Sequence, residues 1–328
     1  MAAPVPVVIL TGFLGSGKTT LLNQILDQPH NQRIAVLVNE FGALGIDGAL
    51  TRPGSRMIEL PNGCVCCTIN GDLLQAALDV LESGDIDLLV VETTGIADPY
   101  PVALSFRQPE LRYRTRVDSI VCLVDSEQMD AGRLTNDTAV NQVAYSDLIV
   151  LNKIDLVDEA RLHELEFRLR LVKPGARVIR ARQARVDLAL LLGQHLGLPG
   201  EHRTVHHHYQ SCSQQGPAPL DPRRLQAFLA GLPGDVLRAK GLVELQGAPA
   251  IVFHVCGTRL TVEPAPTGTR GHRAVFIGEQ LDEPQLTRGW IACHAAPDGK
   301  TAAVDGRNGP GTDLPRLPTS ARLSRTTH

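Results

Sequence analysis

Residues 12–19 read Gly-Phe-Leu-Gly-Ser-Gly-Lys-Thr and fill every position of the phosphate-binding pattern G-x-x-x-x-G-K-[ST]. The apolar, β-branched run Val5–Leu10 before the motif predicts a buried parallel strand. The run Thr19–Gln28 after it predicts a helix, which Pro29 would stop. Strand, glycine loop and helix in this order favour a phosphate site over a glycine-rich turn with an unrelated lysine. The segment therefore predicts a site for a nucleoside triphosphate.

The loop residues have separate expected roles. Backbone N–H groups over residues 15–19 would surround the β-phosphate at the positive end of the helix. Lys18 would reach the β- and γ-phosphates and the Thr19 hydroxyl would ligate Mg²⁺, so both are candidate catalytic residues. The candidate nucleotide-binding residues of this segment are Gly12, Gly15, Ser16, Gly17, Lys18, Thr19 and Thr20.

Composition limits the kind of partner. The chain of 328 residues has room for two domains, and its net charge of −3 argues against a nucleic-acid partner because no basic excess exists. No apolar run approaches the roughly 20 residues that span a bilayer, so we expect no membrane segment. The first residues lack a basic stretch, so we expect no signal peptide. Seven cysteines, three of them within four positions, are typical of metal-binding or redox-active thiols, and we expect a cytoplasmic protein.

Short apolar runs alternate with helical patterns from residue 5 to about residue 180. This alternation predicts an α/β domain with a doubly wound, mostly parallel sheet of the P-loop NTPase kind. Ligands of such sheets bind beyond the carboxyl ends of the strands. The predicted strands are Val5–Leu10, Ile34–Asn39, Leu88–Glu92, Ser119–Asp125, Leu148–Asn152 and Arg177–Arg180, and the predicted helices are Thr19–Gln28, Asp72–Glu82 and Glu159–Leu171.

The composition changes further along the chain and predicts four regions. The P-loop domain covers residues 1–200, and residues 201–220 are interpreted as a histidine-containing linker. Residues 221–294 predict a smaller α+β domain, and residues 295–328 predict a disordered tail because large apolar residues are scarce there. The elements predicted for the smaller domain are the helix Pro222–Gly231 and the strands Gly241–Gln246, Ala250–Cys256, Leu260–Glu263 and Ala274–Ile277.

Residues 152–155 read Asn-Lys-Ile-Asp directly after an apolar strand, which resembles the guanine-reading motif of GTPases. The Asp155 carboxylate can accept hydrogens from N1 and N2 of guanine, whereas adenine has no hydrogen on N1. Asn152 can contact the N7/O6 side of the base, and the stem of Lys153 can lie on its plane. The alternative is that Asp155 caps a helix that begins near Val157.

Residues 92–95 read Glu-Thr-Thr-Gly at the end of the predicted strand Leu88–Glu92. A carboxylate at a strand end can hold Mg²⁺ or its water, so Glu92 is a further candidate catalytic residue, although GTPases more often carry Asp there. Gly95 can offer its N–H to the γ-phosphate and move when that phosphate leaves. The alternative is a plain strand-to-helix turn with a threonine cap.

Residues 63–67 read Gly-Cys-Val-Cys-Cys, so Cys64, Cys66 and Cys67 crowd three thiols into four positions. Thiolates are soft ligands that suit Zn²⁺, Cu⁺ and, less tightly, Co²⁺. A structural zinc site normally takes four ligands, often from two separated pairs, and the sequence has no partner pair. The triplet leaves a coordination position for another ligand, which favours metal transfer. A redox-active pair and a buried cluster are the alternatives.

Two further segments carry candidate ligands. Glu40 follows the second predicted strand, on the rim that holds the phosphate loop. It is a candidate metal ligand or a group that positions water near the γ-phosphate, and a plain surface carboxylate is a third interpretation. His202 and residues 206–208, with Cys212 nearby, could collect metal or form a solvated linker. Cys122, Cys256 and Cys293 are interpreted as strand or core residues.

Taken in order and spacing, five segments resemble the CobW family of metal-handling P-loop GTPases. They are GFLGSGKTTLLN, VNEFGALGIDG, LPNGCVCCTINGDL, ETTGIADP and NKIDL. The similarity covers about residues 5–180 and continues more weakly over residues 236–281. Members of the family bind zinc or cobalt through the CxCC cysteines and are thought to insert it into client proteins or to serve cobalamin synthesis. The resemblance implies GTP at Gly15–Thr19, Asn152 and Asp155, and metal at Cys64, Cys66 and Cys67.

The resulting hypothesis is a GTP-hydrolysing metallochaperone that delivers Zn²⁺ or Co²⁺ to a client metalloprotein. We expect slow turnover without a partner, because no arginine finger stands out in the sequence. The oligomeric state stays open, a homodimer included. The alternatives are a non-catalytic zinc store or thiol redox sensor with structural GTP, and a small-molecule kinase or adenylating enzyme. A client-docking role for the C-terminal sheet is compatible with the main hypothesis.

Overall fold

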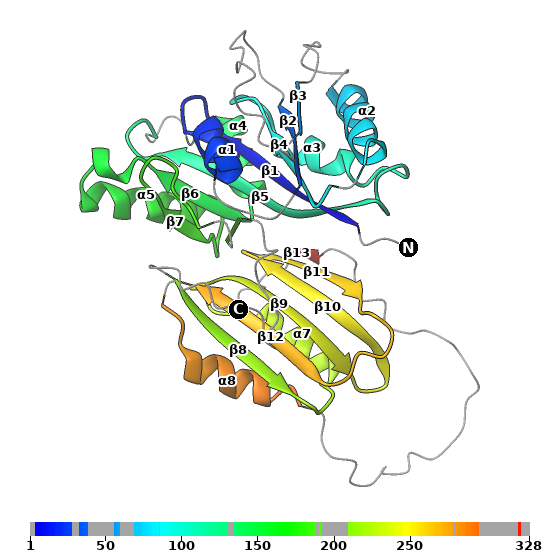
Figure 1. The fold of residues 1–328 in the computed structure, drawn as a ribbon. Helices are drawn as coiled ribbons and strands as arrows, with labels where there is room; N and C mark the ends of the chain where they lie inside the picture. The colour runs from blue at the N-terminus through cyan, green and yellow to red at the C-terminus, as the bar shows by residue number, and fades with distance from the viewer. Residues whose placement is uncertain are drawn as a thin grey trace, which may run out of the picture. The chain divides into compact units, whose positions relative to one another are not determined.

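The computed structural model describes residues 4–27, 33–38, 56–59, 69–84, 86–129, 134, 136–187, 190–191, 209–278, 280–294 and 321–322. The chain divides into two compact units (Figure 1). The first contains residues 1–195 with 256–258, and the second contains residues 196–255 with 259–328. Each unit has its own sheet and its own hydrophobic core.

The first unit is built on a parallel sheet that has seven strands among the described residues. In spatial order the strands are β3 (Arg56–Glu59), β2 (Ile34–Val38), β4 (Leu88–Glu92), β1 (Val5–Gly12), β5 (Thr115–Asp125), β6 (Leu148–Asn152) and β7 (Val178–Arg180). All neighbouring strands run parallel. The strands β2, β4 and β6 are buried along their whole length, as expected of strands covered on both faces.

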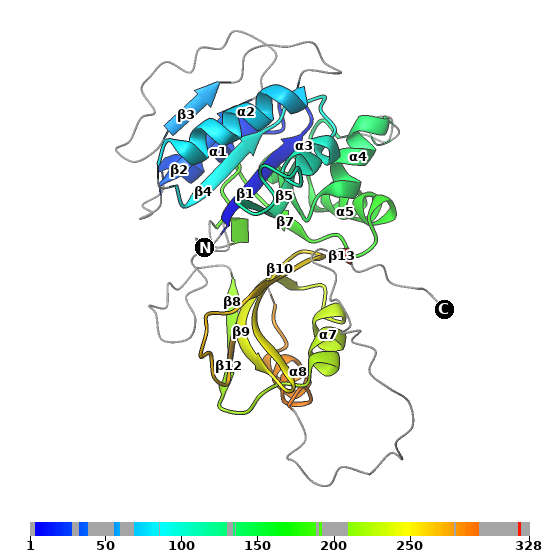
Figure 2. The ribbon, with the colours of Figure 1, turned by 90° about the vertical axis from the view of Figure 1, so that its right-hand side faces the viewer.

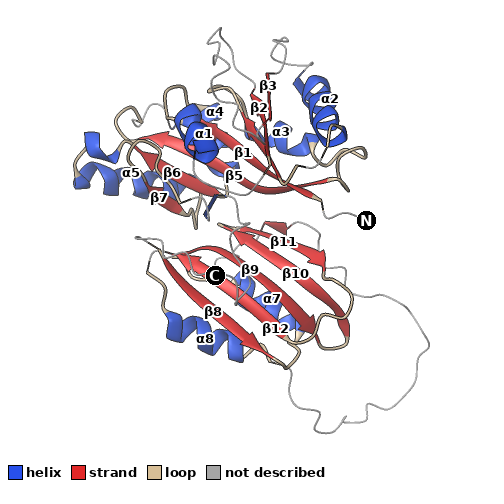
Figure 3. Ribbon diagram, viewed as in Figure 1, coloured by secondary structure: helices blue, strands red, loops and turns tan. Residues whose placement is uncertain are grey.

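Helices cover both faces of this sheet, with α1 in front of it and α3 behind it in Figure 3. They are α1 (Lys18–Asp27), α2 (Ile69–Glu82), α3 (Pro99–Ser105), α4 (Asp137–Tyr145) and α5 (Glu159–Val172), with a 3₁₀ turn η3 at Ile154–Leu156. One core cluster joins Val7 and Ile9 of β1 to Leu73 of α2 and Val102 of α3. A second cluster joins β5 and β6 to α4 and α5. The predicted doubly wound α/β fold is confirmed.

Three elements of the first unit have no clear signal in the sequence. The strand β3 has four residues, of which Arg56 and Glu59 are charged. The helix α3 has seven residues and begins at Pro99 after an Asp98 cap. The helix α4 has nine residues and buries Gln142 beside its apolar side chains. Short elements with polar positions give weak periodicity, so sequence patterns miss them.

In the described part of the chain, the second unit is a sheet that carries two helices. Its strands are, in spatial order, β13 (Ala321–Arg322), β11 (Arg259–Pro264), β10 (Ala248–Cys256), β9 (Val236–Leu245), β12 (His272–Gly278) and β8 (Gln210–Gly216). The strand β12 pairs antiparallel with both β8 and β9. The helices α7 (Pro222–Ala230) and α8 (Glu283–Ile291) join the core through Leu225, Leu229, Leu286 and Trp290. The expected smaller α+β domain is confirmed.

Two region assignments need correction in the second unit. Residues 210–216 form β8, so the predicted linker is wrong for this segment, while residues 201–208 lie outside the described residues. Residues 321–322 form β13, which pairs with β11, so the predicted disordered tail is wrong for these two residues. Among the described residues, no helix is both long and apolar enough to cross a membrane.

Candidate nucleotide-binding site

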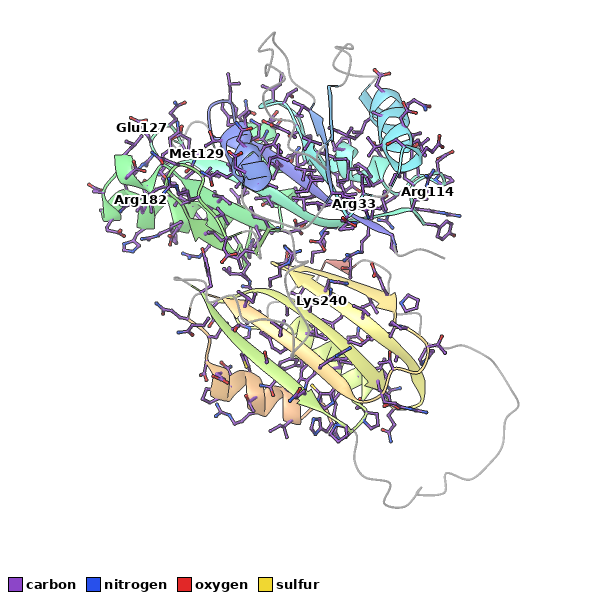
Figure 4. The ribbon with its side chains drawn as sticks, in the orientation of Figure 1. Arg33, Arg114, Glu127, Met129, Arg182 and Lys240 are labelled. Atoms are coloured by element: carbon purple, nitrogen blue, oxygen red, sulfur yellow. The ribbon has the colours of Figure 1, made fainter. Side chains whose placement is uncertain are left out.

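The carboxyl ends of the strands in the first unit gather at one edge of the sheet. Glu127, Met129 and Arg182, which follow β5 and β7, lie at the opposite end from Arg33 and Arg114, which precede β2 and β5 (Figure 4). The residues predicted to bind the phosphates, Mg²⁺ and guanine lie at or just after the ends of β1, β4 and β6 and therefore belong to the first of these edges. This is the edge at which parallel sheets bind ligands.

A cavity of about 490 Å³ opens at this edge. It is lined by two segments: Leu14, Gly15, Gly17, Lys18, Thr19 and Thr20 after β1, and Glu92, Thr93, Thr94, Gly95 and Ile96 from the last residue of β4 onward. The two strands are neighbours in the sheet and pair in register, with Leu10 opposite Glu92. The structure therefore brings together the phosphate loop and the Glu-Thr-Thr-Gly segment, as the sequence predicted.

Lys18 begins α1 and is almost completely buried. Its ammonium group donates to the Gly12 carbonyl at 3.0 Å and to the Phe13 carbonyl at 3.3 Å. These bonds hold the group over its own loop. Because an ammonium has three donors, Lys18 can keep a loop carbonyl and still donate to a phosphate.

Thr19 and Glu92 meet inside the cavity. The Thr19 hydroxyl donates to Glu92 Oε1 at 2.8 Å, and the Glu92 side chain is 4 % exposed. A hydroxyl and a carboxylate side by side form an oxygen donor set, which hard divalent cations such as Mg²⁺ prefer. The residues present therefore fit the metal that the sequence predicted at this position.

Two glycines shape the phosphate loop. Gly12 has a φ of 134°, and a Cβ there would overlap the backbone of Leu123 on β5. Gly17 has a φ of 104°, and a Cβ there would lie 2.5 Å from the amide nitrogen of Asn152. Both positions need a residue without a side chain, for conformation and for space.

Asn152, at the end of β6, ties two loops together. Its Nδ2 donates to the Ser16 carbonyl at 2.9 Å, and its Oδ1 accepts from the Ala184 N–H at 2.7 Å. The side chain is 2 % exposed. Asn152 therefore holds the phosphate loop in position through the Ser16 carbonyl, a role that the sequence motif alone does not indicate. Its expected contact with the base stays a prediction.

The rest of the Asn-Lys-Ile-Asp segment is also placed. Lys153 has a φ of 62°, and its ammonium group donates to Asp125 Oδ2 at 2.7 Å. Asp155 is exposed in η3. The N-cap of α5 is Asp158, which accepts from the Arg161 N–H at 2.8 Å, so the alternative that Asp155 caps the helix is wrong.

The segment after β4 is held against the phosphate loop. The Thr93 N–H donates to the Leu10 carbonyl at 2.9 Å. A Cβ on Gly95 would lie 2.7 Å from the Leu14 nitrogen, so this close approach requires glycine. The N-cap of α3 is Asp98, so the alternative of a threonine cap is wrong.

Sequence reasoning missed two groups of residues around the cavity. The loop after β7 places Gln183 and Ala184 at φ values of 51° and 55° and accepts a hydrogen bond from Gln24. Neither residue is one that signals a left-handed backbone in a sequence. On α4, Asn141 and Gln142 bond to the loop after β4. These contacts join residues that are distant in the sequence, so no local motif predicts them.

The candidate metal ligands Glu40, Cys64, Cys66 and Cys67 lie outside the described residues, as do the four histidines of the linker. Within the described residues, no group of three or more His, Cys, Asp and Glu side chains could hold a metal ion. The roles of these ligands therefore stay predictions.

The cysteines that the structure describes are core residues. Cys122, Cys212, Cys256 and Cys293 are each at most 3 % exposed. Burial raises the pKa of the Cys122 thiol to about 12 and that of the Cys293 thiol to about 11, so neither is a thiolate at neutral pH. Cys212 is the one fully buried residue of β8, and the histidines that precede it lie outside the described residues, so the idea that this loop collects metal stays a prediction.

The sequence matches two known domain families. The CobW/HypB/UreG nucleotide-binding domain matches residues 6–180, which is more than half of the chain. The chain belongs to this family. The cobalamin synthesis protein CobW C-terminal domain matches residues 209–294, from the start of β8 to the end of α8 and its following turn. The phosphate loop and its cavity thus lie in a CobW/HypB/UreG domain, and the chain is a P-loop GTPase.

Two CobW-type relatives are similar over most of their length. The zinc chaperone CobW of Pseudomonas aeruginosa is 32 % identical, over 86 % of this chain and 89 % of the relative. The zinc chaperone YjiA of Escherichia coli is 34 % identical, over 86 % of this chain and 96 % of the relative. The crystal structure of Zn(II)-bound YjiA GTPase from E. coli aligns with a TM-score of 0.48 at 28 % identity, over 90 % of this chain and 100 % of that one.

Proposed function

We propose that this protein is a GTP-hydrolysing metallochaperone that binds Zn²⁺ as cargo and delivers it to a client metalloprotein. The observation that carries the proposal is the cavity in which Lys18 and the Thr19–Glu92 pair face the segment Thr93–Ile96. The family membership supports the enzyme class, and the relatives named zinc chaperones support the cargo.

The nucleotide is bound along the edge of the sheet. The loop from Gly12 to Thr20 holds the phosphates, and Gly95 offers its N–H to the γ-phosphate. Asp155 reads the guanine edge, since it is exposed after β6 and is not used as a helix cap. Thr19 and Glu92 hold Mg²⁺, which neutralises charge on the phosphates when bound.

The cargo is held by the thiolates of Cys64, Cys66 and Cys67, with Glu40 as the further ligand. Support comes from the register of the sheet, in which Val38 of β2 pairs with Glu59 of β3 and with Glu92 of β4. The strand β3 thus ends at the same edge of the sheet as β4, whose last residue lines the cavity. Cys64 follows Glu59 by five residues, a length of chain that spans at most about 17 Å.

The two sites are coupled through this shared edge. While the γ-phosphate is present, Gly95 and Glu92 are held in one arrangement and the thiolates keep the metal. Loss of the γ-phosphate releases this segment, and Zn²⁺ passes to the client. Soft sulfur ligands also accept Co²⁺, so cobalt competes with zinc at the same cysteines.

The proposal is tested with a variant that carries Cys64→Ser, Cys66→Ser and Cys67→Ser. We expect it to lose the stoichiometric zinc of the wild-type chain and to keep guanine nucleotide binding. Cys212→Ala, a change in the core of the second unit, is the matched control and keeps its zinc. Unchanged zinc stoichiometry in the triple variant would overturn the proposed cargo site. Zinc binding without any phosphate release from GTP would instead indicate a zinc store with structural GTP.

A further inference from the structure

We propose that Gln142 on α4 is a positioning residue that sets the loop after β4 to distinguish GTP from GDP. The inference rests on the nucleotide site proposed above. Gln142 is 2 % exposed and is not among the described residues that line the cavity. Its side-chain nitrogen donates to the Gly95 carbonyl and to the Ala97 carbonyl, at 3.1 Å each.

The two bonds fix the turn from both of its ends. An amide nitrogen carries two hydrogens, and Gln142 gives one to each carbonyl. The Ala97 N–H closes the turn by donating to the Thr94 carbonyl at 3.1 Å. A planar trans peptide directs its N–H opposite to its C=O. The bond to Gly95 therefore turns the Ile96 N–H away from α4, and Ile96 lines the cavity.

The phosphate loop meets the same turn on another side. The backbone of Leu14 lies so close to Gly95 that no Cβ would fit between them. Gly95 is itself buried, between the phosphate loop and the amide of Gln142. A movement of Gly95 toward or away from a γ-phosphate would therefore alter the length of its hydrogen bond to Gln142.

A second contact from α4 acts outside the cavity lining. The Asn141 side chain donates to Asp98 Oδ2 at 2.8 Å, and Asp98 caps α3 through the Tyr100 N–H. The ring of Tyr100 stacks on Tyr145 of α4 with a centroid separation of 4.8 Å. The helices α3, α4 and α5 lie side by side in Figure 2. Asn141 thus anchors α3, whereas Gln142 anchors the segment proposed to contact the γ-phosphate.

The difference between the two side chains gives the inference its test. In the proposed site the α- and β-phosphates contact the loop after β1, and only the γ-phosphate reaches Gly95. Disturbing the turn should therefore weaken GTP binding and hydrolysis and leave GDP binding largely intact. Disturbing Asn141 should lower the stability of α3 without changing the preference between the two nucleotides.

The experiment measures the Kd of GDP and of a non-hydrolysable GTP analogue, with Mg²⁺, for the wild-type chain and for Gln142→Leu. We expect the analogue to bind about tenfold more weakly to the variant and GDP to change by less than about twofold. We also expect kcat for GTP to fall. Asn141→Ala is the matched control and keeps the wild-type ratio of the two Kd values.

An unchanged ratio of the two Kd values in Gln142→Leu would overturn the inference, and so would an equal weakening of both nucleotides. If the leucine variant fails to fold, Gln142→Asn replaces it, because it keeps the amide but shortens the side chain. The same selective loss of GTP-analogue binding is expected, and an unchanged ratio of the two Kd values would again overturn the inference. A wild-type chain that binds neither nucleotide would overturn the proposed function itself. The two failures are therefore distinguishable.

Discussion

The side chain of Asn152 donates a 2.9 Å hydrogen bond to the carbonyl of Ser16. Its other end accepts a hydrogen bond from the Ala184 N–H, so one buried amide joins the loop after β1 to the loop after β7. Gly17 leaves room for this amide. Asn152, the first residue of the Asn-Lys-Ile-Asp motif, thus also holds the phosphate loop. The fold therefore fixes the position of the motif relative to the phosphate loop.

The variant Asn152→Ala tests this tie. It leaves two buried backbone groups without their partner, so we expect the free energy of unfolding to fall by about 1–3 kcal/mol. Because these hydrogen bonds support the phosphate loop, which contacts both nucleotides, the binding of GTP and of GDP should weaken equally. Titration calorimetry would measure both affinities. Asn136→Ala, which removes the N-cap of α4, should lose about 1 kcal/mol of stability and keep its nucleotide affinity. A loss confined to GTP would contradict this account of Asn152.

The preference for guanine depends on Asp155. Asp155→Ala removes a carboxylate that accepts two base hydrogens, so GTP should bind roughly 10- to 100-fold more weakly, in line with about 1.5–3 kcal/mol for hydrogen bonds to a charged group. Weak ATP binding should stay unchanged, as competition with a labelled nucleotide would show. Asp158→Ala, the N-cap of α5, should cost stability alone. Unaltered selectivity in Asp155→Ala would remove Asp155 from the base site.

The Thr19–Glu92 pair predicts how activity depends on Mg²⁺. Glu92→Gln keeps an acceptor for the Thr19 hydroxyl and removes the negative charge. We expect Mg²⁺ affinity in the presence of a GTP analogue to fall roughly 10- to 100-fold, with a parallel fall in hydrolysis at low Mg²⁺. Thr19→Ser keeps the hydroxyl and should behave like the wild-type chain. The same Mg²⁺ titration curve for Glu92→Gln and wild type would argue against a cation at this pair.

His272 makes the stability of the second unit depend on pH. Burial lowers the pKa of His272, and the nearby His294 adds to this effect while the bond to the Ala218 carbonyl opposes it. The folded pKa therefore lies below the unfolded value of about 6.5, and the unfolded chain binds more protons between the two. The stability contributed by neutral His272 is complete above the unfolded pKa and is lost as the pH falls from there through the folded pKa.

Trp290 provides the measurement. It is the single tryptophan of the chain, and its ring centroid lies 5.5 Å from that of His272. Urea unfolding followed by tryptophan fluorescence should show a lower midpoint at about pH 5.5 than at about pH 7.5. His272→Asn keeps a donor for Ala218 and should reduce this difference, whereas the change His163→Gln at an exposed position should leave it. An undiminished difference in His272→Asn would assign the effect to other groups.

Much of the first unit could be predicted from local patterns. The strands β1, β4 and β6 are continuous apolar runs because both faces are covered, and the phosphate loop has a motif of its own. The sequence of β8 predicts a linker because the strand lies at the edge of its sheet and buries Cys212 alone among polar side chains. An edge strand with one fully buried side chain gives no hydrophobic period to detect.

The motifs identified the residues around the cavity but not how they are held. The motif predicts that Asn152 contacts a base, whereas its bonds to Ser16 and Ala184 join it to segments more than 30 residues away in either direction. Gln142 lies on a helix that the sequence did not predict. Such contacts depend on which elements the fold brings together, so local patterns in a single sequence do not predict them.

The central claim is that the nucleotide state controls the hold on zinc, and the most direct test is the zinc affinity of the wild-type chain in two states. Zinc Kd values are measured by competition with a chelator, first with a non-hydrolysable GTP analogue and then with GDP, both with Mg²⁺. The account predicts that zinc binds at least about fivefold more tightly in the GTP-analogue state. Equal zinc affinities in the two states would contradict it.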